Sequence, residues 1–393
     1  MVDIYEAQKI ILSYTTPITK TEIIPIEKSE NRVLAENISA TFDMPRFDNS
    51  AMDGFGIKLS DKGKKVKIID RFLAGDTPIS IKEGEAVKIM TGAKVDSSIE
   101  AVVPIEFVKI NEEYVELPTD IKEKANIRPK GEEFKKGTIL LTKGEVLNHS
   151  KISLLASLGI THIKVFLKPK VLVIPTGNEI KNHYETISET EHFNSSSHFF
   201  MFEKLADVTT LPIVGDRIEE IEKVIDKKFD LIITTGGVSK GDADFTTQAF
   251  KNRGYDIKFS WINIKPGKPF GFAVNENIAT LLTGNPLAAV FNYQIFVKPL
   301  IRKMAGCKEF FIDFQMLKTE NSLKRKAGRD EVIPVNLSEK GVILSAKRGS
   351  GMISVTTKSD GIIIVDKGKW EINGEIKFID FNRWSETFKE FIS

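Results

Sequence analysis

The chain has 393 residues, of which 41% are apolar and 28% are charged, and its formal net charge is +2. This length predicts more than one domain, the composition is typical of a folded globular protein, and the near-neutral charge argues against a nucleic-acid partner. The single cysteine, Cys307, excludes an intramolecular disulfide, and no apolar run approaches the ~20 residues that span a bilayer. We therefore expect a cytoplasmic protein without a membrane partner.

Residues 1–168 are predicted to form a strand-rich N-terminal region. The first segment has the period of an amphipathic helix, with four apolar residues on one face: Ile4, Ala7, Ile10 and Ile11. Short apolar runs separated by Gly, Pro and Asp predict strands at 64–69, 86–90 and 101–105. The region ends in a helix within HSKISLLASLGI, where Ser150 is the expected N-cap and Gly159 the expected stop.

Residues 169–305 alternate buried strands with helices. Continuous apolar runs predict strands at 170–175, 229–235 and 277–283. Helical patterns occur at 195–205, 217–228, 242–252 and 286–304. This alternation is typical of a parallel sheet covered by helices on both faces, the doubly wound α/β class, in which ligands bind beyond the carboxyl ends of the strands.

Residues 306–393 return to short strands, and the runs EVIPVNL, VILSA, GIIIVD and EIKFIDF indicate a small all-β domain. One helical pattern, WSETFKEFI, occurs at the end. The basic stretch SLKRKAGRDE (322–331) is interpreted as a surface loop. Because no low-complexity linker separates the three regions, we expect them to pack together.

Each strand of the central region is followed by a turn that contains Thr-Gly. The three turns are PTGNEI, TTGGVSKGDAD and TGNPLAAV, and they converge on one edge if the strands are parallel. Glycine lets a backbone approach a ligand and a hydroxyl adds a donor, so Gly236, Gly237 and Ser239 are candidates for a phosphate cradle. One such motif is more often only a tight turn, but three at one edge favour a phosphate site.

Charged residues follow the same strands. Lys265 and Lys268 in KPGKPFGF can face a phosphate or oxyanion, and a solvated charged turn is the alternative. Four carboxylates also follow predicted strands: Glu179, Asp216, Asp242 and Asp244. Mg²⁺ bound by one or two carboxylates and substrate phosphates would explain acids beside an anion site. The alternative is helix capping; we expect one of Asp242 and Asp244 to cap the helix that follows and the other to take part in the chemistry, with Asp244 preferred as the cation ligand.

Several polar residues are given structural roles instead. His183, His192 and His198 match no common metal-binding spacing and are expected to be solvated. Asn194 and Ser195 are expected to cap the next helix and to approach the ligand. Cys307 is expected to be an unreactive thiol.

Seven short motifs occur in order over nearly the whole chain: DNSAMDGF (48–55), MTGA (90–93), NIRPKGE (126–132), PTGNEI, TTGGVSKGDADF, IKPGKPF and TGNPLAAV. Each alone is weakly specific. Together they resemble the MoeA family, the molybdopterin molybdenumtransferases, which include the C-terminal domain of gephyrin.

The resemblance implies a homodimer of three-part chains. Residues 1–168 would form a composite, dimer-forming N-terminal region, 169–305 a molybdopterin-binding α/β domain, and 306–393 a C-terminal β-barrel domain. It also implies a Mg²⁺-dependent reaction in which molybdate is inserted into adenylylated molybdopterin, so that molybdenum cofactor forms and AMP is released. The adenylylated substrate would be handed over by the molybdopterin adenylyltransferase.

The resemblance and the residue chemistry together give the candidate site. The candidates for catalysis are Asp53, Thr91, Glu179 and Asp244. The candidates for substrate binding are Arg128, Gly236, Gly237, Ser239, Lys265, Lys268, Asn285 and Ser350. The candidate metal ligands are Asp216, Asp242 and Asp244. Among them, the resemblance implies that Asp53, Thr91 and Arg128 reach across the dimer interface.

Two positions depart from the family pattern. Thr283 stands in TGNPLAAV where many members have proline, which is a mild change. Trp261 stands four residues before Lys265, where some bacterial members have a second lysine. The change at Trp261 shifts the expected molybdate contact to Lys268 or Lys258.

Two alternatives to this enzyme are considered. A non-catalytic scaffold of the same fold would bind molybdopterin without turnover, but the chain keeps Asp53, Glu179 and Asp244 and lacks a long linker. A pyrophosphatase acting on another nucleotide conjugate would leave the N-terminal region and the β-domain unexplained. We therefore favour the transferase.

Overall fold

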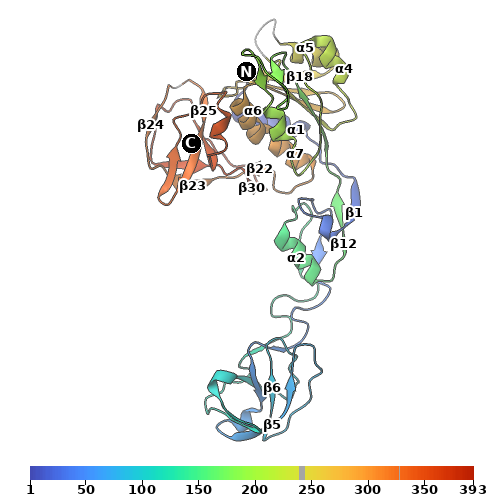
Figure 1. Ribbon diagram of the computed structural model, residues 1–393, viewed down its shortest axis with the longest axis vertical. Helices are drawn as coiled ribbons and strands as arrows, with labels where there is room; N and C mark the ends of the chain where they lie inside the picture. Colours follow the sequence, from blue (N-terminus) through green and yellow to red (C-terminus); the bar gives the residue numbers. More distant parts are fainter. Residues whose placement is uncertain (239–243, 327) are drawn as a thin grey trace. The chain divides into compact units, whose positions relative to one another are not determined.

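The computed structural model describes residues 1–238, 244–326 and 328–393. Contacts group the chain into two compact units (Figure 1). The larger unit consists of Met1–Glu36, Lys143–Ser153 and Ile160–Ser393. The smaller unit consists of Asn37–Thr142 and Leu154–Gly159.

The smaller unit is built on a six-stranded sheet. In spatial order its strands are β7 (Ala101–Pro104), β4 (Gly54–Ile57), β6 (Glu85–Ile89), β5 (Lys65–Phe72), β9 (Tyr114–Glu116) and β8 (Lys109–Asn111). Strands β5, β6 and β7 confirm the three strands predicted in this part of the sequence. Both faces carry a core, because Phe55 and Ile57 pack into one apolar cluster and Val87 and Ile89 into another. Two short antiparallel pairs complete the unit, β3 (Asn49–Ser50) with β10 (Ile127–Arg128), and β2 (Ile38–Ser39) with β11 (Ile139–Leu141).

The larger unit also contains a six-stranded sheet. In spatial order its strands are β16 (Asp207–Thr210), β13 (Lys170–Pro175), β17 (Leu231–Thr235), β21 (Ile278–Leu282), β20 (Pro269–Val274) and β18 (Asp256–Trp261). The first four strands are parallel. Three of them, β13, β17 and β21, are the predicted strands, whereas β16 was not predicted. Strand β20 runs antiparallel to β21, because only residues 275–277 connect the two strands and a parallel crossover needs a dozen or more residues. Strand β18 runs antiparallel to β20 and therefore in the same direction as the first four strands.

Helices cover both faces of this sheet. Alternate residues of each strand face opposite sides, so Val171 and Val173 belong to one apolar cluster and Leu172 and Ile174 to the other. The first face is covered by α1 (Ile4–Tyr14), α3 (Ser196–Phe200), α6 (Pro286–Asn292) and α7 (Lys298–Met304). The second face is covered by α4 (Ile218–Val224) and α5 (Phe245–Asn252). The doubly wound arrangement predicted from the sequence is therefore confirmed.

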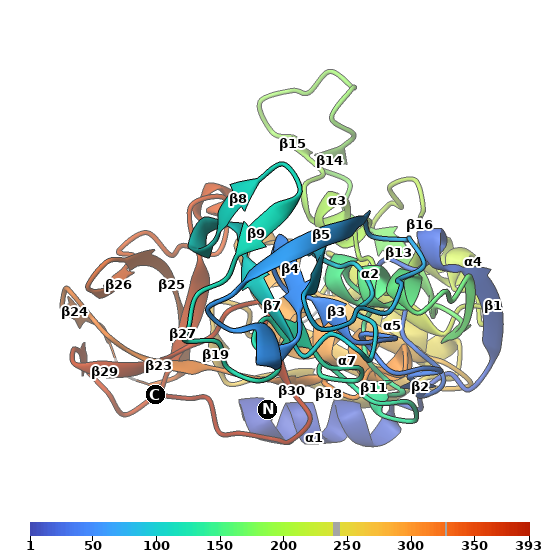
Figure 2. The same cartoon turned by 90° about the horizontal axis from the view of Figure 1, so that it is seen from below.

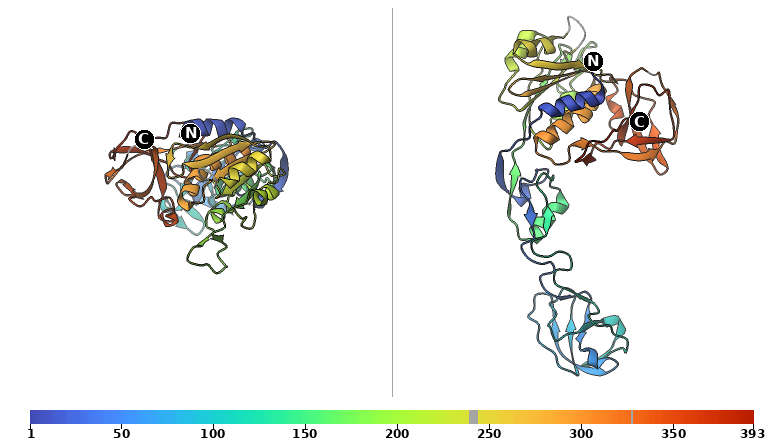
Figure 3. Two further views of the ribbon diagram at one scale, coloured as in Figure 1. Left: turned by 90° about the horizontal axis from the view of Figure 1, so that it is seen from above. Right: turned by 180° about the vertical axis from the view of Figure 1, so that it is seen from behind.

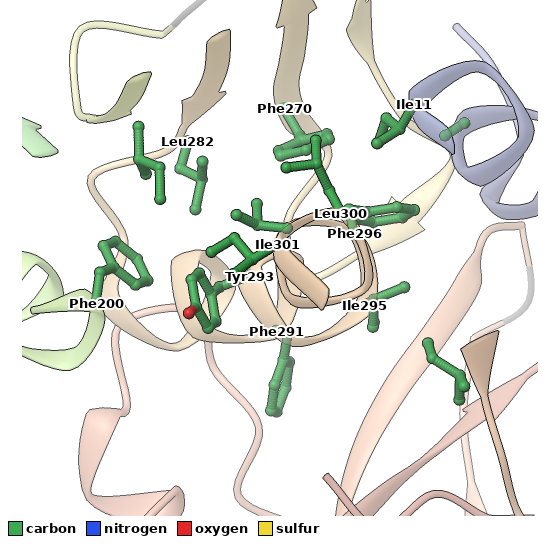
Figure 4. Close-up of a cluster of buried hydrophobic side chains, with 14 of the residues drawn as sticks. Ile11, Phe200, Phe270, Leu282, Phe291, Tyr293, Ile295, Phe296, Leu300 and Ile301 are labelled. Atoms are coloured by element: carbon green, nitrogen blue, oxygen red, sulfur yellow. The ribbon is translucent and has the colours of Figure 1, made fainter. Parts of the chain in front are cut away.

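The core on the first face contains stacked aromatic rings among its aliphatic side chains (Figure 4). Phe200 of α3 stacks on Tyr293 with ring centroids 4.8 Å apart, and Phe270 of β20 stacks on Phe296 at 5.1 Å. Tyr293 and Phe296 lie in a single π-helical turn, η5 (Tyr293–Val297), that joins α6 to α7. The predicted helix over 286–304 is thus present as one continuous helical segment with a π-helical turn in its middle.

The N-terminal helix α1 lies alongside η5 and α7 (Figure 3). Of the four residues of the predicted apolar face, Ile4, Ala7 and Ile11 are buried and Ile10 is partly buried. The Gln8 side chain donates to the carbonyl of Ile295 at 3.0 Å, and the Lys303 ammonium donates to the carbonyl of Leu12 at 2.6 Å. The helix therefore belongs to the core of the larger unit.

Residues after the central sheet form mostly strands. Their bounds are β22 (Phe311–Ile312), β23 (Gln315–Lys318), β24 (Leu323–Lys324), β25 (Asp330–Ser338), β26 (Gly341–Leu344), β27 (Gly361–Val365), β28 (Glu371–Ile372), β29 (Glu375–Phe378) and β30 (Trp384–Ser385). Strand β25 pairs with β26 and β27, and with the short β19 (Ile264–Lys265) of the central region. Ile333, Val335 and Ile363 pack into the core of this part of the chain.

Four shorter strands occur elsewhere in the larger unit. Strand β1 (Thr21–Pro25) pairs antiparallel with β12 (His162–Phe166), and β14 (Ile180–Lys181) pairs in parallel with β15 (His192–Phe193).

Helix α2 (His149–Ser157) begins before the predicted cap, because the side chain of Asn148, rather than Ser150, accepts from the Lys151 backbone N–H at 3.1 Å. Gly159 has a left-handed φ of +70°, which confirms it as the stop.

The helix predicted in WSETFKEFI is wrong, since the segment forms β30 followed by an irregular stretch. Its aromatic side chains are held by separate partners. Trp384 packs against the guanidinium of Arg302 at 4.4 Å, and Phe391 lies edge-on to Tyr5 at 5.1 Å. These tertiary contacts outweigh the helical pattern of the segment.

The remaining predictions on the chain as a whole concern the membrane and the thiol. None of the described residues forms a helix of the length and hydrophobicity needed to cross a bilayer. Cys307 is buried, and burial raises the pKa of its thiol to about 11. Because the thiolate is the reactive form, this agrees with the prediction of an unreactive thiol.

Candidate functional site

The carboxyl ends of β13, β17 and β21 bring the three Thr-Gly turns together. The Thr176 backbone N–H donates to the carbonyl of Thr235 at 2.8 Å, and the Gly236 N–H donates to the carbonyl of Leu282 at 2.9 Å. A side chain built on Gly284 would lie 3.5 Å from the Cα atom of Gly236. The predicted convergence of the turns at one edge of the sheet is therefore confirmed.

Two glycines are required where the turns meet. Gly236 has a φ of +104°, and a Cβ atom there would lie 2.3 Å from the carbonyl oxygen of Thr176. Gly237 has a φ of +62°, and a Cβ atom there would lie 2.3 Å from the hydroxyl of Thr246. No other residue type fits both the backbone conformation and the space. The Thr246 side chain also donates to the carbonyl of Gly236 at 3.1 Å, which ties the turn to α5.

A pocket of about 600 Å³ opens above these turns, within the larger unit. Four of the predicted site residues line it: Glu179, Gly236, Gly237 and Asn285. Its size falls within the range that accommodates a small organic ligand. The sequence-based prediction of a ligand site beyond the strand ends therefore coincides with a real cavity.

One wall of the pocket comes from the segment His192–Ser196. The residues between β14 and β15 form a long loop, and β15 then pairs with β14 (Figure 2). Backbone N–H groups of His192 and Asn194 donate to the carbonyls of Glu179 and Lys181, both at 2.8 Å, and fix the returning segment beside Glu179. His192, Phe193 and Ser196 were not predicted as site residues, although an aromatic residue in this polar stretch was a usable signal.

The side chain of Asn194 caps α3, as predicted, by accepting from the Ser197 N–H at 3.3 Å. The prediction for Ser195 as a cap is wrong, because its side chain makes no capping hydrogen bond. Both residues line the pocket.

Asp216 is held at the start of α4 by a reciprocal pair of hydrogen bonds. The Asn178 N–H donates to its carboxylate and its own N–H donates to the Asn178 side chain, both at 3.1 Å. The other carboxylate oxygen, Oδ1, is buried with no hydrogen-bond partner. A buried carboxylate oxygen without a donor is costly, so this atom is suited to a cation that arrives with a ligand.

Asp244 is the N-cap of α5, with its carboxylate accepting from the Thr247 N–H at 3.3 Å. The capping alternative considered for this acid is therefore correct, and one of its oxygens is committed to the helix. Asp242 and Ser239 lie outside the described residues. Within 1–238, 244–326 and 328–393, no three His, Cys, Asp or Glu side chains form a group that could hold a metal ion alone.

The two predicted lysines lie at the same edge of the sheet as the turns. Trp261 pairs with Pro269, and Phe270 pairs with Leu282, so the connection that carries Lys265 and Lys268 emerges beside the end of β21. The Lys268 ammonium lies 5.7 Å from the centre of the Trp261 ring. Trp261 thus supports a cation at this edge.

Lys258, the other residue considered for the molybdate contact, is directed elsewhere. It forms an ion pair with Asp256 and lies 4.5 Å from the ring centre of Tyr14. Asp256 pairs with Val274, at the opposite end of β20 from Pro269. Between the two alternatives, the geometry favours Lys268.

Glu331 contacts a predicted site residue, Lys265, and the sequence interpretation did not single it out. Its fully buried carboxylate accepts from the Lys265 ammonium at 3.1 Å, from Arg325 at 2.7 Å and from Arg348 at 2.9 Å. Burial alone would raise the pKa of Glu331, but the hydrogen bonds from the three cations hold it below its ordinary value. The interpretation of 322–331 as a surface loop is therefore wrong at Arg325 and Glu331, which are buried.

Ser350 contacts the same region through its backbone. Its carbonyl accepts from the N–H groups of Leu287 and Ala288, at 2.9 and 3.3 Å, at the start of α6. Asn285, Pro286 and Gly351 line the pocket on either side of this contact. The loop that holds Ser350 thus forms part of the pocket wall.

Three predicted site residues lie in the smaller unit. The backbone N–H and the hydroxyl of Thr91 donate to the Asp53 carboxylate at 2.8 and 2.7 Å, and these hydrogen bonds lower the pKa of Asp53. Arg128 is exposed on β10, which pairs with β3, while the Gly92 N–H donates to the carbonyl of Ser50 in β3. Within this unit, Asp53, Thr91 and Arg128 therefore surround one strand.

Comparison with protein-family models matches three models in chain order. The MoeA N-terminal region (domain I and II) matches residues 2–159, a probable molybdopterin binding domain matches residues 172–303, and the MoeA C-terminal region (domain IV) matches residues 317–375. These matches follow the predicted division into a strand-rich N-terminal region, a central α/β domain and a strand-rich C-terminal domain.

Individual proteins are similar over most of the chain. A molybdopterin molybdenumtransferase of Haemophilus influenzae is 34% identical over 377 residues, which cover 90% of this chain and 92% of that protein. One of Staphylococcus aureus is 35% identical over 303 residues, which cover 73% and 72%. The crystal structure of a molybdopterin biosynthesis moeA protein from Pyrococcus horikoshii has a TM-score of 0.82 at 26% identity and covers 97% of this chain and 100% of that one. This structure confirms the predicted multi-domain fold.

The junction of the turns yields a test on stability. We expect Gly236→Ala to lower the free energy of unfolding by about 1–3 kcal/mol, because the methyl group meets the Thr176 carbonyl and φ is positive. Gly351→Ala is the matched control at the same pocket, since a Cβ atom there has nothing within 4 Å, and it should change stability by less than about 0.5 kcal/mol. Denaturant unfolding of both variants measures this; equal stability of the two would contradict the described packing.

Proposed function

Since this chain belongs to the MoeA family, we propose that it acts as a molybdopterin molybdenumtransferase in molybdenum cofactor biosynthesis, and that the pocket at the ends of β13, β17 and β21 is where adenylylated molybdopterin binds. The observation that carries this proposal is the meeting of three Thr-Gly turns beneath one cavity. Molybdate would react at the dithiolene of the bound substrate, and AMP would leave.

The pocket provides for the two chemical parts of such a ligand. Backbone at Gly236 and Gly237 permits close approach of a phosphate, because neither residue has a side chain in the way. Phe193, Ile180 and Ile353 give the rim an apolar surface suited to a flat ring. Glu179 and Asn285 supply polar groups that would orient the ligand between them.

Lysines at the edge of the sheet would neutralise the anions. Lys265 and Lys268 are proposed to face the phosphate or the molybdate as the pyrophosphate bond is cleaved. Arg128, with Asp53 and Thr91, would reach this pocket from a second copy of the chain in a homodimer. The hydrogen bonds from Thr91 keep the Asp53 carboxylate ionised and oriented for that role.

Mg²⁺ is the proposed cofactor, and the residues present fit it. Asp216 offers a buried carboxylate oxygen without a donor, and Asp244 and Asp242 are the other proposed ligands. Because Mg²⁺ takes one or two carboxylates plus substrate phosphates, we propose that the bound substrate supplies the rest of its coordination. When bound, the cation would stabilise negative charge on the phosphates.

Two further proposals concern the setting of the reaction. We place the protein in the cytoplasm, where a single buried thiol is consistent with reducing conditions. The molybdopterin adenylyltransferase is proposed to hand over the substrate. A scaffold that binds without turnover is not favoured, because the relatives are named as transferases.

The reaction can be tested with purified protein, adenylylated molybdopterin, molybdate and Mg²⁺. We expect AMP release to require molybdate and to stop when the divalent cation is chelated, and we expect added Mg²⁺ to restore it. Chromatography of AMP and of the molybdenum cofactor measures both products. Release of AMP without any need for molybdate would favour a pyrophosphatase instead.

The proposed role of Asp244 as a cation ligand can be tested separately from its structural role as a helix cap. Asp244→Asn should keep the cap, since asparagine caps helices as well as aspartate does, yet lower turnover by about 100-fold or more through loss of a cation ligand. Asp3→Asn is the matched control, because Asp3 caps α1 by accepting from the Glu6 N–H at 2.8 Å. If both variants release AMP at the wild-type rate, Asp244 is only a cap.

A further inference from the structure

We propose that Glu331 is a positioning residue of the transferase reaction, and that it acts on the substrate through Lys265 and Arg348. The inference rests on the proposed contact between Lys265 and an anionic substrate. Glu331 itself is fully buried, so it would not touch the substrate.

Glu331 connects two loops that approach the site from different parts of the chain. Lys265 belongs to β19, in the connection between β18 and β20, and β19 pairs with the start of β25, where Glu331 lies. Arg348 lies in the loop between β26 and η6 (Ile353–Val355). One carboxylate oxygen, Oε1, accepts from both Lys265 and Arg348, at 3.1 and 2.9 Å. The two cations are therefore held side by side by a single atom.

The other carboxylate oxygen is anchored in the core. Oε2 accepts from the buried Arg325 guanidinium at 2.7 Å, and Arg325 also donates to the carbonyls of Asp366 and Lys369, both at 2.7 Å. This network fixes the orientation of the carboxylate plane. Fixing Oε2 in this way also fixes where Oε1 places the two outer cations.

The charges in the group do not cancel. Three cations face one carboxylate, so the four side chains of Lys265, Arg325, Arg348 and Glu331 carry an excess of positive charge. The excess lies toward solvent, since the side chain of Lys265 is 47% exposed while that of Arg325 is 1% exposed. The three cations give this accessible rim a positive potential that favours the arrival of an anion, and the role of Glu331 is to fix where Lys265 and Arg348 lie.

Arg348 links this group to the pocket. It lies two residues before Ser350, whose carbonyl accepts from the start of α6. By holding Arg348, Glu331 restrains the loop that carries Arg348 and Ser350. The residue after Ser350 in this loop, Gly351, lines the pocket. A second restraint acts on the Lys265 loop, where the buried Asn292 side chain donates to the carbonyl of Gly267 at 2.9 Å.

The experiment is a double-mutant cycle in the AMP-release assay. Glu331→Gln is expected to lower kcat/KM by about tenfold, mainly by raising the KM for the same substrate whose KM is raised in Lys265→Ala. In the Lys265→Ala background, Glu331→Gln should cause little further loss, because its effect passes through the missing ammonium. A purely structural role would instead give additive losses, and additivity would overturn the proposal.

A matched control exists in the same part of the chain. Asp313 is buried and accepts from Arg383 and Lys389, both at 2.7 Å, and neither of these partners is a proposed substrate-binding residue. Asp313→Asn should keep kcat and KM within about twofold of wild type even if it lowers thermal stability. An equal rise of KM in Asp313→Asn and Glu331→Gln would also overturn the proposal.

Further measurements distinguish failure of the variant to fold, failure of the proposed Lys265 contact and failure of the proposed reaction. If Glu331→Gln does not fold, the cycle is run with Glu331→Asp, which keeps the charge for Arg325 but shortens the reach to Lys265; it should show the same non-additivity. If Lys265→Ala leaves KM unchanged, the proposed contact of Lys265 fails, and so does the positioning role. Failure of the whole reaction would appear separately, as absence of AMP release by the wild-type protein.

Discussion

The parallel pairing of β13, β17 and β21 is the constraint on which the candidate site depends. Pro175 pairs with Thr235, and Thr235 pairs with Leu282, so the three strands end at the same level and their turns must meet. A shift of one residue would turn every side chain of a strand to the opposite face, and helices bury both faces. The register is therefore fixed by the hydrophobic core, and the pocket follows from the register.

The C-terminal strands contribute to the same edge through polar contacts. Pairing of β19 with β25 sets Lys265 beside Glu331, and the Ser350 carbonyl joins the neighbouring loop to α6. We interpret them as the means by which a separate strand-rich region contributes cations and a pocket wall to an α/β sheet, which agrees with a family model that covers this region as well.

Most of the fold could be predicted from the pattern of hydrophobic residues. The site could be predicted only in part, because some of its polar contacts join residues that are far apart in the sequence. The run at 170–175 is an observed strand in full, and three Thr-Gly turns were enough to predict the position of the pocket. Glu331 could not be found in this way, because its partner Lys265 is 66 residues away and the adjacent sequence is simply basic. WSETFKEFI has the period of a helix, but Trp384 and Phe391 are held by tertiary partners that no local pattern reveals.

The most direct test of this account is a crystal structure of the protein with adenylylated molybdopterin bound. We predict that a phosphate of the ligand lies against the backbone at Gly236 and Gly237, with the pterin beside Phe193 and an ammonium of Lys265 or Lys268 facing the anionic groups. Ligand density outside this pocket, with the Thr-Gly turns unoccupied, would contradict the assignment of the site.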